Sequence, residues 1–252
     1  MAGNHIYFAS DLHLGVPDKA NSLARERLFI EWLEQVRNNA AEIFLVGDLF
    51  DFWHDYETVV PKGHVRLLGK IAEITDAGIP VHVFTGNHDL WMYGYLEEEV
   101  GVKVYRAPIT REFGGKQFFI GHGDGLGPGD HGYKFIKKVF ANPVCQFLFK
   151  WLHPDIGTRL ASFLSKRSRY GATGNEKVLE EFKGADQEWL VAYAKRVLER
   201  QPVDYFVFGH RHLPLDIRLN DKSRYVNLGD WLDYNSYAEF DGNELHLKYY
   251  KK

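Results

Sequence analysis

Cysteine is almost absent from this sequence: Cys145 is the single one among 252 residues. One thiol cannot build an intramolecular disulfide framework or a cysteine-rich zinc site, so the fold has to rest on its hydrophobic core. A chain of this length can bury a sizeable core as one domain, and we expect a single domain over residues 1–252. The lack of disulfides is typical of a reducing compartment, and we expect the protein to be cytoplasmic.

A positive charge excess and long apolar runs are also absent. The formal net charge is -3, whereas a general nucleic-acid binder normally carries a basic excess, so we expect no nucleic-acid partner. No run approaches the roughly 20 apolar residues of a membrane span. Residues 1–4 lead into a short strand without the basic and apolar regions of a secretory signal. We therefore expect a soluble protein, or one that makes peripheral contact with the cytoplasmic face of the inner membrane.

Short apolar runs alternate with amphipathic segments in the first part of the chain. Leu28, Trp32 and Val36 follow the four-residue spacing of one helix face. The predicted elements, in chain order, are a strand over 5–9, a helix over 21–39, a strand over 42–46, a helix over 63–77 and a strand over 81–85. Strand, helix and strand in succession make two βαβ units, which require parallel strands.

Turn signals become frequent in the later part of the chain. Gly114-Gly115 predicts a hairpin before a strand over 116–120. A helix over 186–200 precedes a strand over 205–208, and turns are expected at 220–221 and 241–242. We predict an α/β fold in which two mixed sheets pack face to face with helices outside, a four-layer αββα sandwich.

Polar motifs follow the apolar runs at five places, all expected on one rim because open α/β sheets place their sites at strand ends. Taken singly, each motif is more often structural than functional. Their joint recurrence in one chain indicates a metal centre. The five motifs are Ser10-Asp11-Leu12-His13, Gly47-Asp48-Leu49-Phe50-Asp51, Gly86-Asn87-His88-Asp89, Gly121-His122-Gly123-Asp124 and Gly209-His210-Arg211-His212.

Asp48 is the candidate for a shared ligand. It ends a buried apolar run, and its two carboxylate oxygens can touch two cations held roughly 3.5 to 4 Å apart, as in two-metal hydrolases. Asp, Asn and His donors without any thiolate favour manganese, with iron, zinc or magnesium as alternatives. The cofactor prediction is therefore two divalent metal ions, with Mn²⁺ as the first choice.

The five motifs resemble the blocks of the calcineurin-like metallophosphoesterases, in that family's order. In such a site the metal pair lowers the pKa of a bridging water, and the resulting hydroxide attacks phosphorus. The resemblance implies that His88 binds the phosphoryl group or acts as the acid, with Asp51 orienting its ring; a turn-stabilising role for Asp51 is the alternative. It implies one metal held by Asp11, His13, Asp48 and His212, and a second held by Asp48, Asn87, His122 and His210.

A segment of different composition spans residues 125–183. It opens with glycine and proline and then becomes aromatic and basic, and Pro143 and Pro154 divide it into short helices. An ordinary helical hairpin packed on the core is one interpretation. The other is a cap, because aromatic faces flanked by Lys and Arg suit an interfacial helix or an acyl-chain pocket beside a phosphate.

The whole chain is similar to the UDP-2,3-diacylglucosamine diphosphatases of lipid A synthesis. The similarity rests on the motif 121–124, on Asp130-His131-Gly132-Tyr133 and on a Phe-rich cap that ends in Ser168-Arg169. It implies cleavage of a sugar-nucleotide pyrophosphate into UMP and 2,3-diacylglucosamine 1-phosphate, with the cap receiving the acyl chains. The substrate contacts that it implies are Asn87, His88, Asp130, Ser168, Arg169 and His210.

One residue departs from this lipid branch, whose best-known members, as the resemblance suggests, carry Arg where this chain has His88. A generic phosphoesterase or phosphodiesterase acting on another lipid or nucleotide ester is therefore the alternative. A binding scaffold with a degenerate metal site would lack a ligand, and none is missing. The physiological metal and the oligomeric state stay open. The histidines outside the motifs are interpreted as surface or packing residues: His5, His54, His64, His82, His153 and His246.

Overall fold

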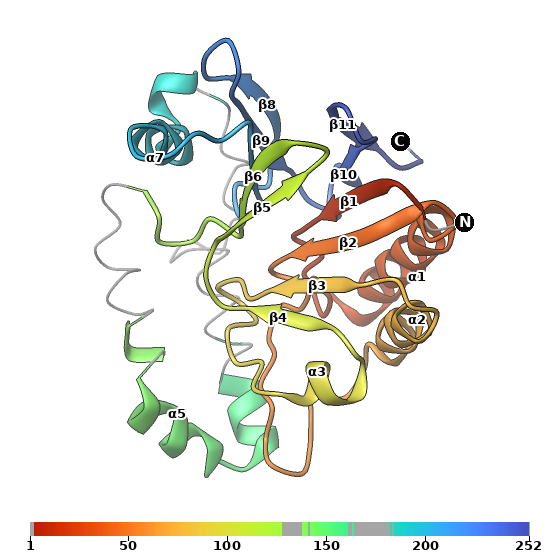
Figure 1. The fold of residues 1–252 in the computed structure, drawn as a ribbon. Helices are drawn as coiled ribbons and strands as arrows, with labels where there is room; N and C mark the ends of the chain where they lie inside the picture. The colour runs from red at the N-terminus through yellow and green to blue at the C-terminus, as the bar shows by residue number, and fades with distance from the viewer. Residues whose placement is uncertain are drawn as a thin grey trace.

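A computed structural model describes residues 3–127, 138–140, 142–160, 163, 182 and 184–251. Eleven strands in this part of the chain form two sheets that pack face to face (Figure 1). The first sheet has the order β11-β10-β1-β2-β3-β4, with β1 to β4 parallel and β10 and β11 antiparallel to their neighbours. Its strands are β1 (His5–Ala9), β2 (Ala40–Val46), β3 (Val81–Phe84), β4 (Lys103–Tyr105), β10 (Ser236–Phe240) and β11 (Leu245–Tyr249).

The second sheet has the order β5-β6-β7-β9-β8 and is also mixed. Strands β6, β7 and β9 run parallel, and the hairpin partners β5 and β8 are antiparallel to them. Both sheets therefore contain the parallel strand ends that the sequence predicts. The strands are β5 (Ile109–Phe113), β6 (Lys116–Gly121), β7 (Tyr205–Phe208), β8 (Pro214–Arg218) and β9 (Arg224–Leu228).

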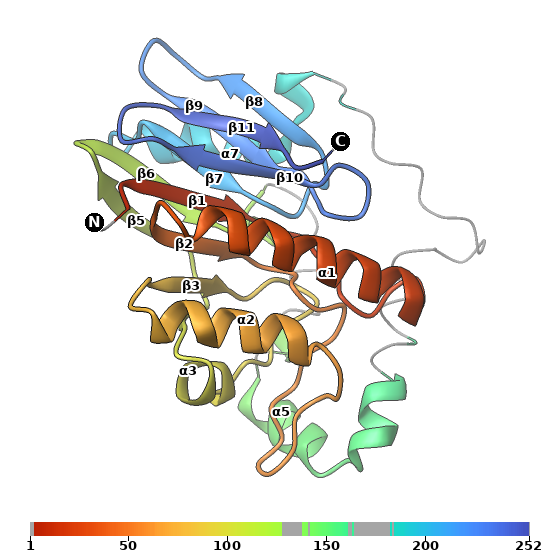
Figure 2. The same ribbon diagram turned by 90° about the vertical axis from the view of Figure 1, so that its right-hand side faces the viewer.

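Helices cover the outer face of each sheet, and three hydrophobic clusters fill the spaces between the layers. Helices α1 (Lys19–Val36) and α2 (Val65–Asp76) lie side by side on the first sheet, and α7 (Trp189–Leu198) lies on the second (Figure 2). One cluster, which includes Trp32 and Ile71, joins α1 and α2 to the first sheet. A second cluster lies between the sheets, and a third joins α7 to the second sheet. The predicted four-layer sandwich is confirmed.

Element boundaries follow local signals that the sequence carries. Asp18 caps α1 by accepting the backbone N–H groups of Ala20 and Asn21, so the helix begins at Lys19 rather than at residue 21. Gly78 follows α2 with a φ of +83°, the left-handed conformation that ends many helices. The β5–β6 hairpin turns at Gly114 and Gly115, whose φ angles are +55° and +73°.

The helix predicted over 186–200 is divided in the structure. A single turn η1 (Ala185–Gln187) is separated from α7 by Glu188, whose backbone is extended with φ −79° and ψ 109°. The apolar periodicity continued through this break and could not reveal it. Helix α3 (Tyr95–Glu99) and the short strand β4 were also not predicted as separate elements.

Within residues 125–183 the structure describes two short helical pieces. Helix α5 (Pro143–Lys150) begins at Pro143 under an Asn142 cap, and residues 154–160 form a second helical stretch after Pro154. Both prolines therefore start a helix, where a missing N–H costs nothing. Helix α5 lies apart from the sandwich at the lower end of Figure 1.

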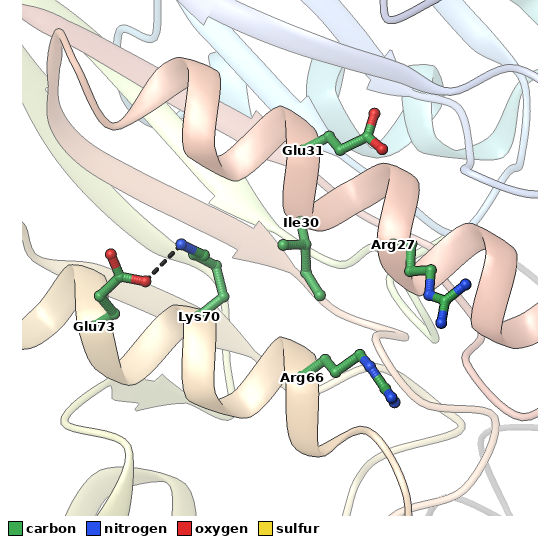
Figure 3. Close-up of a pocket in the computed structure, with 6 residues that line it drawn as sticks. All are labelled: Arg27, Ile30, Glu31, Arg66, Lys70 and Glu73. Atoms are coloured by element: carbon green, nitrogen blue, oxygen red, sulfur yellow. Dashed lines mark hydrogen bonds and ion pairs between the residues drawn. The ribbon is translucent and has the colours of Figure 1, made fainter.

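The outer surface of α1 and α2 carries ion pairs over a shallow groove of about 490 Å³ (Figure 3). Lys70 binds Glu73 on the same helix and Glu34 on the neighbouring one. These partners are exposed, so the pairs contribute little to stability. No helix of the described residues has both the length and the hydropathy that a membrane crossing demands.

Candidate metal centre

The loops after β1, β2, β3, β6 and β7 meet at one rim of the sandwich and carry the five motifs. Backbone hydrogen bonds join two of these loops: the N–H of Asp11 donates to Gly47 O at 3.0 Å, and the N–H of His13 donates to Asp48 O at 2.9 Å. The Asp11, Asp48 and His122 side chains are all buried. Residues far apart in the sequence are therefore fixed against one another before any ligand binds.

Five of the predicted ligands have a left-handed backbone. Their φ angles are 56° for Asp11, 43° for His13, 52° for Asp48, 68° for His210 and 54° for His212. Non-glycine residues seldom adopt this conformation because it costs about 1 to 3 kcal/mol each in strain. The surrounding packing and hydrogen bonds hold the loops in this strained conformation. The conformation directs the donor atoms toward one another.

The glycines of the motifs allow close approach of neighbouring side chains. A Cβ on Gly86 would lie 2.1 Å from Asp48 Oδ1, and a Cβ on Gly209 would lie 2.5 Å from Asp11 Oδ2. On Gly47 it would lie 2.5 Å from His122 Nδ1. Any side chain at these three positions would displace a candidate ligand, which explains the glycines at 47, 86 and 209.

One group of donors comprises Asp11, His13 and His212. His13 Nε2 lies 3.2 Å from His212 Nε2 and 3.7 Å from Asp11 Oδ1, and His212 Nε2 lies 3.5 Å from Asp11 Oδ1. His13 Nε2 is also 3.7 Å from Asp48 Oδ2. The ligand atoms of Asp11, His13 and His212 all lie within 4.8 Å of one another, a separation that one cation can bridge.

A second group comprises Asp48, His122 and His210, whose ligand atoms also lie within 4.8 Å of one another. His122 Nε2 is 3.3 Å from Asp48 Oδ2 and 3.3 Å from Asn87 Oδ1. The same oxygen, Asp48 Oδ2, therefore faces both groups. This is the division into two metal positions that the sequence analysis assigned, and the ligand roles themselves stay a prediction.

His88 and Asp51 lie beside these two groups. His88 Nδ1 is 3.2 Å from the carbonyl oxygen of Asp51 and 3.6 Å from its Oδ1 atom. The backbone N–H of His88 donates to Asp48 Oδ1 at 2.9 Å. The His88 ring packs edge-on against His13, with centroids 4.8 Å apart. His88, Asp51 and His13 thus form a third cluster whose ligand atoms lie within 4.8 Å of one another.

A set of outer hydrogen bonds orients the donor side chains. His122 Nδ1 lies 2.9 Å from Val46 O, and His212 Nδ1 lies 3.1 Å from Asp230 Oδ2. In both rings this leaves Nε2 to face the cluster, and such partners fix the tautomer of a ligating imidazole. Sequence reasoning did not single out Asp230, although Gly229-Asp230 repeats after β9 the glycine and carboxylate that follow β2.

Asp89 is a second residue that sequence reasoning left without a role. Its carboxylate accepts the backbone N–H groups of Gly86 at 2.7 Å and of Leu49 at 2.8 Å, which ties two motif loops together. Burial, reinforced by the nearby Asp48 carboxylate, raises the pKa of Asp89 to about 7. Asp89 therefore acts on the loops that carry Asp48 and Asn87, and it is not one of the clustered donors.

A buried ion pair fixes the loop that carries His210 and His212. Arg211 Nε and Nη2 each donate at 2.8 Å to the two carboxylate oxygens of Glu188. This bidentate geometry is the strong form of the Arg–carboxylate contact. Glu188 is the residue whose extended backbone separates η1 from α7. Trp189 packs edge-on against the His210 ring, with centroids 5.6 Å apart.

The electrostatics of the cluster follow from burial and from the packing of like and unlike charges. Burial raises the pKa of Asp11, with His212 acting in the opposite direction. Burial would raise the pKa of Asp48 as well, but His122, His88 and His13 together outweigh it and the pKa falls well below its usual range. Burial alone would lower the pKa of His122, yet the Asp48 carboxylate raises it to about 10. Burial lowers the pKa of His210 to about 3.

This donor set fits divalent metal ions. Two buried carboxylates, an amide oxygen and four imidazoles are borderline-to-hard donors, and buried carboxylates are normally paired with cations or coordinate metals. Two Nε2 atoms facing each other at 3.2 Å can both be satisfied by a cation between them. The donor side chains at the rim therefore match the chemistry of a two-metal site.

The fold and the rim define a class of protein. The family model of calcineurin-like phosphoesterases matches residues 5–214, and the chain belongs to this family. Members bind divalent metals, so the protein is a metal-dependent hydrolase with candidate metal sites at the rim.

Particular relatives follow from sequence comparison. The chain is 40% identical over 252 residues to a Porphyromonas gingivalis protein named UDP-2,3-diacylglucosamine hydrolase, with 96% of each chain covered. A Yersinia pestis protein of the same name is 25% identical over 248 residues, covering 95% of this chain and 96% of that protein. Among solved structures, Vacuolar Protein Sorting 29 from Cryptosporidium parvum is 13% identical with a TM-score of 0.47, each chain being fully covered. The predicted family resemblance and hydrolase class are confirmed.

The structure brings together most of the predicted site residues. Asp11, His13, Asp48, Asn87, His122, His210 and His212 lie in the two donor groups, and His88 and Asp51 lie beside them. The predicted substrate contacts Asp130, Ser168 and Arg169 lie outside the described residues.

Proposed function

We propose that the chain hydrolyses the pyrophosphate bond of UDP-2,3-diacylglucosamine, releasing UMP and 2,3-diacylglucosamine 1-phosphate. The observation that carries the proposal is a rim with two groups of candidate metal donors in a chain that is 40% identical, over 96% of its length, to a protein named for this substrate. Helix α5, whose Phe149 contacts Phe52 and Trp91 in the loops after β2 and β3, supports a substrate with acyl chains. We also propose one domain over 1–252, with 125–183 as its cap.

The proposed ligands are Asp11, His13, Asp48 and His212 for one ion, and Asp48, Asn87, His122 and His210 for the other, with Mn²⁺ as the physiological metal. Bound there, the pair of ions would neutralise phosphoryl charge and activate water for attack on phosphorus. Asp48 is suited to the shared position because its Oδ2 atom is 3.3 Å from His122 Nε2 and 3.7 Å from His13 Nε2.

His88 is the proposed acid or phosphoryl-binding residue. Its Nδ1 atom faces the carbonyl oxygen of Asp51 at 3.2 Å, so an N–H at that position is held by Asp51. When the ring carries both protons, Nε2–H is the donor available to a phosphoryl oxygen or to the leaving oxygen. Asp51 is a positioning residue in this scheme because it sets the direction in which His88 points.

The acyl chains are proposed to bury against the cap. Where α5 meets the core, Phe149 packs on Trp91 with centroids 4.5 Å apart and on Phe52 at 6.3 Å. Each acyl methylene removed from water would contribute about 0.8 kcal/mol. Asn87, His210, Asp130, Ser168 and Arg169 are kept as proposed substrate contacts.

Peripheral contact with the inner membrane from the cytoplasmic side is part of the proposal. Helix α5 and the stretch after it expose large apolar side chains together with Lys150 and Arg159, which suits an interfacial segment that meets anionic lipid. The exposed fractions are 64% for Val144, 58% for Phe147, 62% for Leu148, 76% for Trp151, 59% for Ile156 and 60% for Phe163.

The test supplies the Mn²⁺-loaded protein with UDP-2,3-diacylglucosamine and, separately, with bis-p-nitrophenyl phosphate. Release of UMP from the lipid at a kcat/KM far above that for the generic ester is the expected result. Turnover of the generic ester alone would favour the second candidate, a phosphoesterase for another lipid or nucleotide ester. His88 is the observation that favours this second candidate, because a histidine can shuttle a proton near neutral pH, whereas the Arg of the lipid branch cannot.

A further inference from the structure

Helix α1 carries an arginine on the face that packs on the first sheet. Arg25 precedes Phe29 by four residues and Trp32 by seven, which places it on the same side of the helix as these two core residues. Arg25 is only 8% exposed. Arginine is almost never buried unless its charge and its donors are satisfied. The charge at this position therefore points to a role beyond core packing.

The guanidinium group of Arg25 donates to backbone carbonyl oxygens of the loop after β1. Its Nε atom lies 2.6 Å from Leu12 O, and its Nη2 atom lies 2.8 Å from His13 O and 2.5 Å from Val16 O. All of these accepting residues are buried. Hydrogen bonds from a charged donor are shorter and stronger than those between neutral groups. Arg25 is therefore firmly bound to the loop that carries Asp11 and His13.

Two of these bonds hold the peptide groups on either side of the His13 Cα atom. The Leu12 carbonyl belongs to the peptide before this atom and the His13 carbonyl to the peptide after it, and the orientations of these peptides set φ and ψ. The N–H groups of the same two peptides donate to the loop after β2. The His13 nitrogen lies 2.9 Å from Asp48 O, and the Leu14 nitrogen lies 3.0 Å from Leu49 O. Each peptide is thus fixed at both ends.

His13 needs this restraint because its backbone is left-handed, with a φ of 43°. A non-glycine residue keeps such a conformation only where its surroundings impose it. In this conformation His13 Nε2 lies 3.2 Å from His212 Nε2 and 3.7 Å from Asp11 Oδ1, within the first group of donors. Release of either peptide would let φ return to the common negative range and turn the imidazole away from this group.

We propose that Arg25 is a positioning residue for the metal ion of the first donor group, and that it acts through the backbone of His13. This role rests on the proposed function, in which His13 is a ligand, and it adds a residue that lies outside the five motifs. The second group is oriented differently, since His122 Nδ1 faces Val46 O at 2.9 Å. Loss of the Arg25 guanidinium should therefore weaken one ion and spare the other.

The first experiment measures Mn²⁺ binding to Arg25→Met, which keeps an unbranched side chain and removes all of its donors. One ion should lose affinity by about 10 to 100-fold, the usual effect of removing an outer partner of a ligand, and the other should keep the wild-type affinity. At a Mn²⁺ concentration that just fills both wild-type sites, electron paramagnetic resonance should show an uncoupled ion. Equal weakening of both ions in a folded variant, or unchanged affinity for both, would overturn the proposal.

Milder variants keep the test decisive if Arg25→Met does not fold. Arg25→Lys keeps the charge but lacks the planar fork of donors, so it should weaken the same ion by less. Ser22→Ala should also have a smaller effect on that ion, because it removes a neutral bond to the same loop, from Gly15 N–H to Ser22 Oγ at 2.8 Å. Arg27→Met, exposed in the groove of Figure 3, is the matched control and should change neither ion. Wild-type affinities in both milder variants would refute the role of Arg25.

Hydrogen exchange in the metal-free protein, followed by NMR, separates this inference from the proposed function. The His13 and Leu14 N–H groups should exchange at least about tenfold faster in the Arg25 variants than in wild type, because their peptides are then held at one end only. The Gly209 N–H, which donates to His122 O at 3.0 Å, is the reference and should be unchanged. A wild-type protein that binds no pair of ions would refute the proposed function. Unchanged exchange at His13 and Leu14, with both ions bound by wild type, would refute the role of Arg25 alone.

Discussion

The rim and helix α5 contrast in how far the fold determines them. The rim side chains Asp11, Asp48 and His122 are buried, left-handed backbones aim the donors, and glycines admit them at close range. None of the eight residues of α5 is buried, although its large side chains are apolar. The rim is thus organised before it meets a ligand, whereas the exposed apolar face of α5 is suited to a lipid partner. Variants can test each half of this contrast.

The largest effect is expected for Asp48→Asn, which keeps the shape of the side chain and removes its charge. Loss of the shared carboxylate should lower turnover by about 10³-fold or more and remove at least one metal ion. Turnover and metal content by elemental analysis are the measurements. Asp221→Asn, on an exposed turn, is the control. A variant that keeps two ions and full rate would contradict the assignment of Asp48.

His88→Gln should slow the reaction by about 10² to 10⁴-fold, the usual contribution of a general acid, while both metals stay bound. Steady-state kinetics and metal content separate the two effects. If His88→Gln lost as much metal as Asp48→Asn, His88 would be a ligand and the division of roles would be wrong. His88→Arg keeps a donor to the phosphoryl group. It should therefore restore part of any loss in substrate binding, seen in KM, but it should not restore the proton transfer.

Glu188→Gln should weaken metal binding by about 10 to 100-fold, because Arg211 then loses its charged partner and the loop of His210 and His212 is less firmly held. Metal titration measures the affinity. Exchanging the two residues in Glu188→Arg with Arg211→Glu should restore part of it. If the pair were only structural, Glu188→Gln would lower the unfolding temperature and leave the metal affinity of the folded protein unchanged. That result would refute the positioning role.

Metal binding should release protons. The Asp48 carboxylate, acting against burial, raises the pKa of His122 to about 10, so the ring is charged at pH 7 in the metal-free protein. A ligating imidazole must be neutral, so affinity should fall by about tenfold for each pH unit below that pKa. In the metal-free protein the same ion pair stabilises the fold below the unfolded pKa of His122, and this contribution is lost as pH rises through about 10.

Calorimetry in two buffers with different ionisation enthalpies counts the protons released at pH 7. At least one proton should leave when metal binds, and His122→Asn should release one fewer. The pKa of His210, lowered to about 3 by burial, means that this residue contributes none. Metal uptake without proton release would contradict the charged state assigned to His122.

The smallest effect on chemistry is expected from the α5 surface. Leu148→Ser with Trp151→Ser should reduce partition to anionic vesicles by about tenfold or more, because each large apolar side chain contributes about 1.5 to 3 kcal/mol when buried. Hydrolysis of a soluble ester should be unchanged. Val65→Ser, exposed on α2, is the control. A loss of bound metal, or of turnover of the soluble ester, would show that α5 supports the rim. It would contradict the contrast between the rim and α5.

Much of the fold was predictable because local patterns and tertiary packing agree. The parallel strands, helices α1 and α2, and the Gly114-Gly115 turn appear where periodicity and turn chemistry put them. The clustering of the motifs followed from one rule, that parallel strand ends share a rim. The division between η1 and α7 was not predictable from local patterns; Glu188, at the break, pairs with Arg211, which lies 23 residues further along the chain.

Hydrogen-bond partners that lie far apart in the chain also could not be predicted from the sequence. Asp230 reaches His212 from the loop after β9, and Asp89 joins two loops through backbone N–H groups that leave no residue pattern. His54 was interpreted as a surface or packing residue. It does pack against aromatic side chains, and its ring nitrogens have no hydrogen-bond partner among the described residues, which follows from side chains of three separate segments.

Manganese titration followed by electron paramagnetic resonance tests the central claim most directly, that one rim holds two neighbouring cations with Asp48 between them. The account predicts two Mn²⁺ per chain with the spectrum of an exchange-coupled pair, and loss of the coupling in Asp48→Asn. Uncoupled ions, or a coupled pair that survives this substitution, would contradict it.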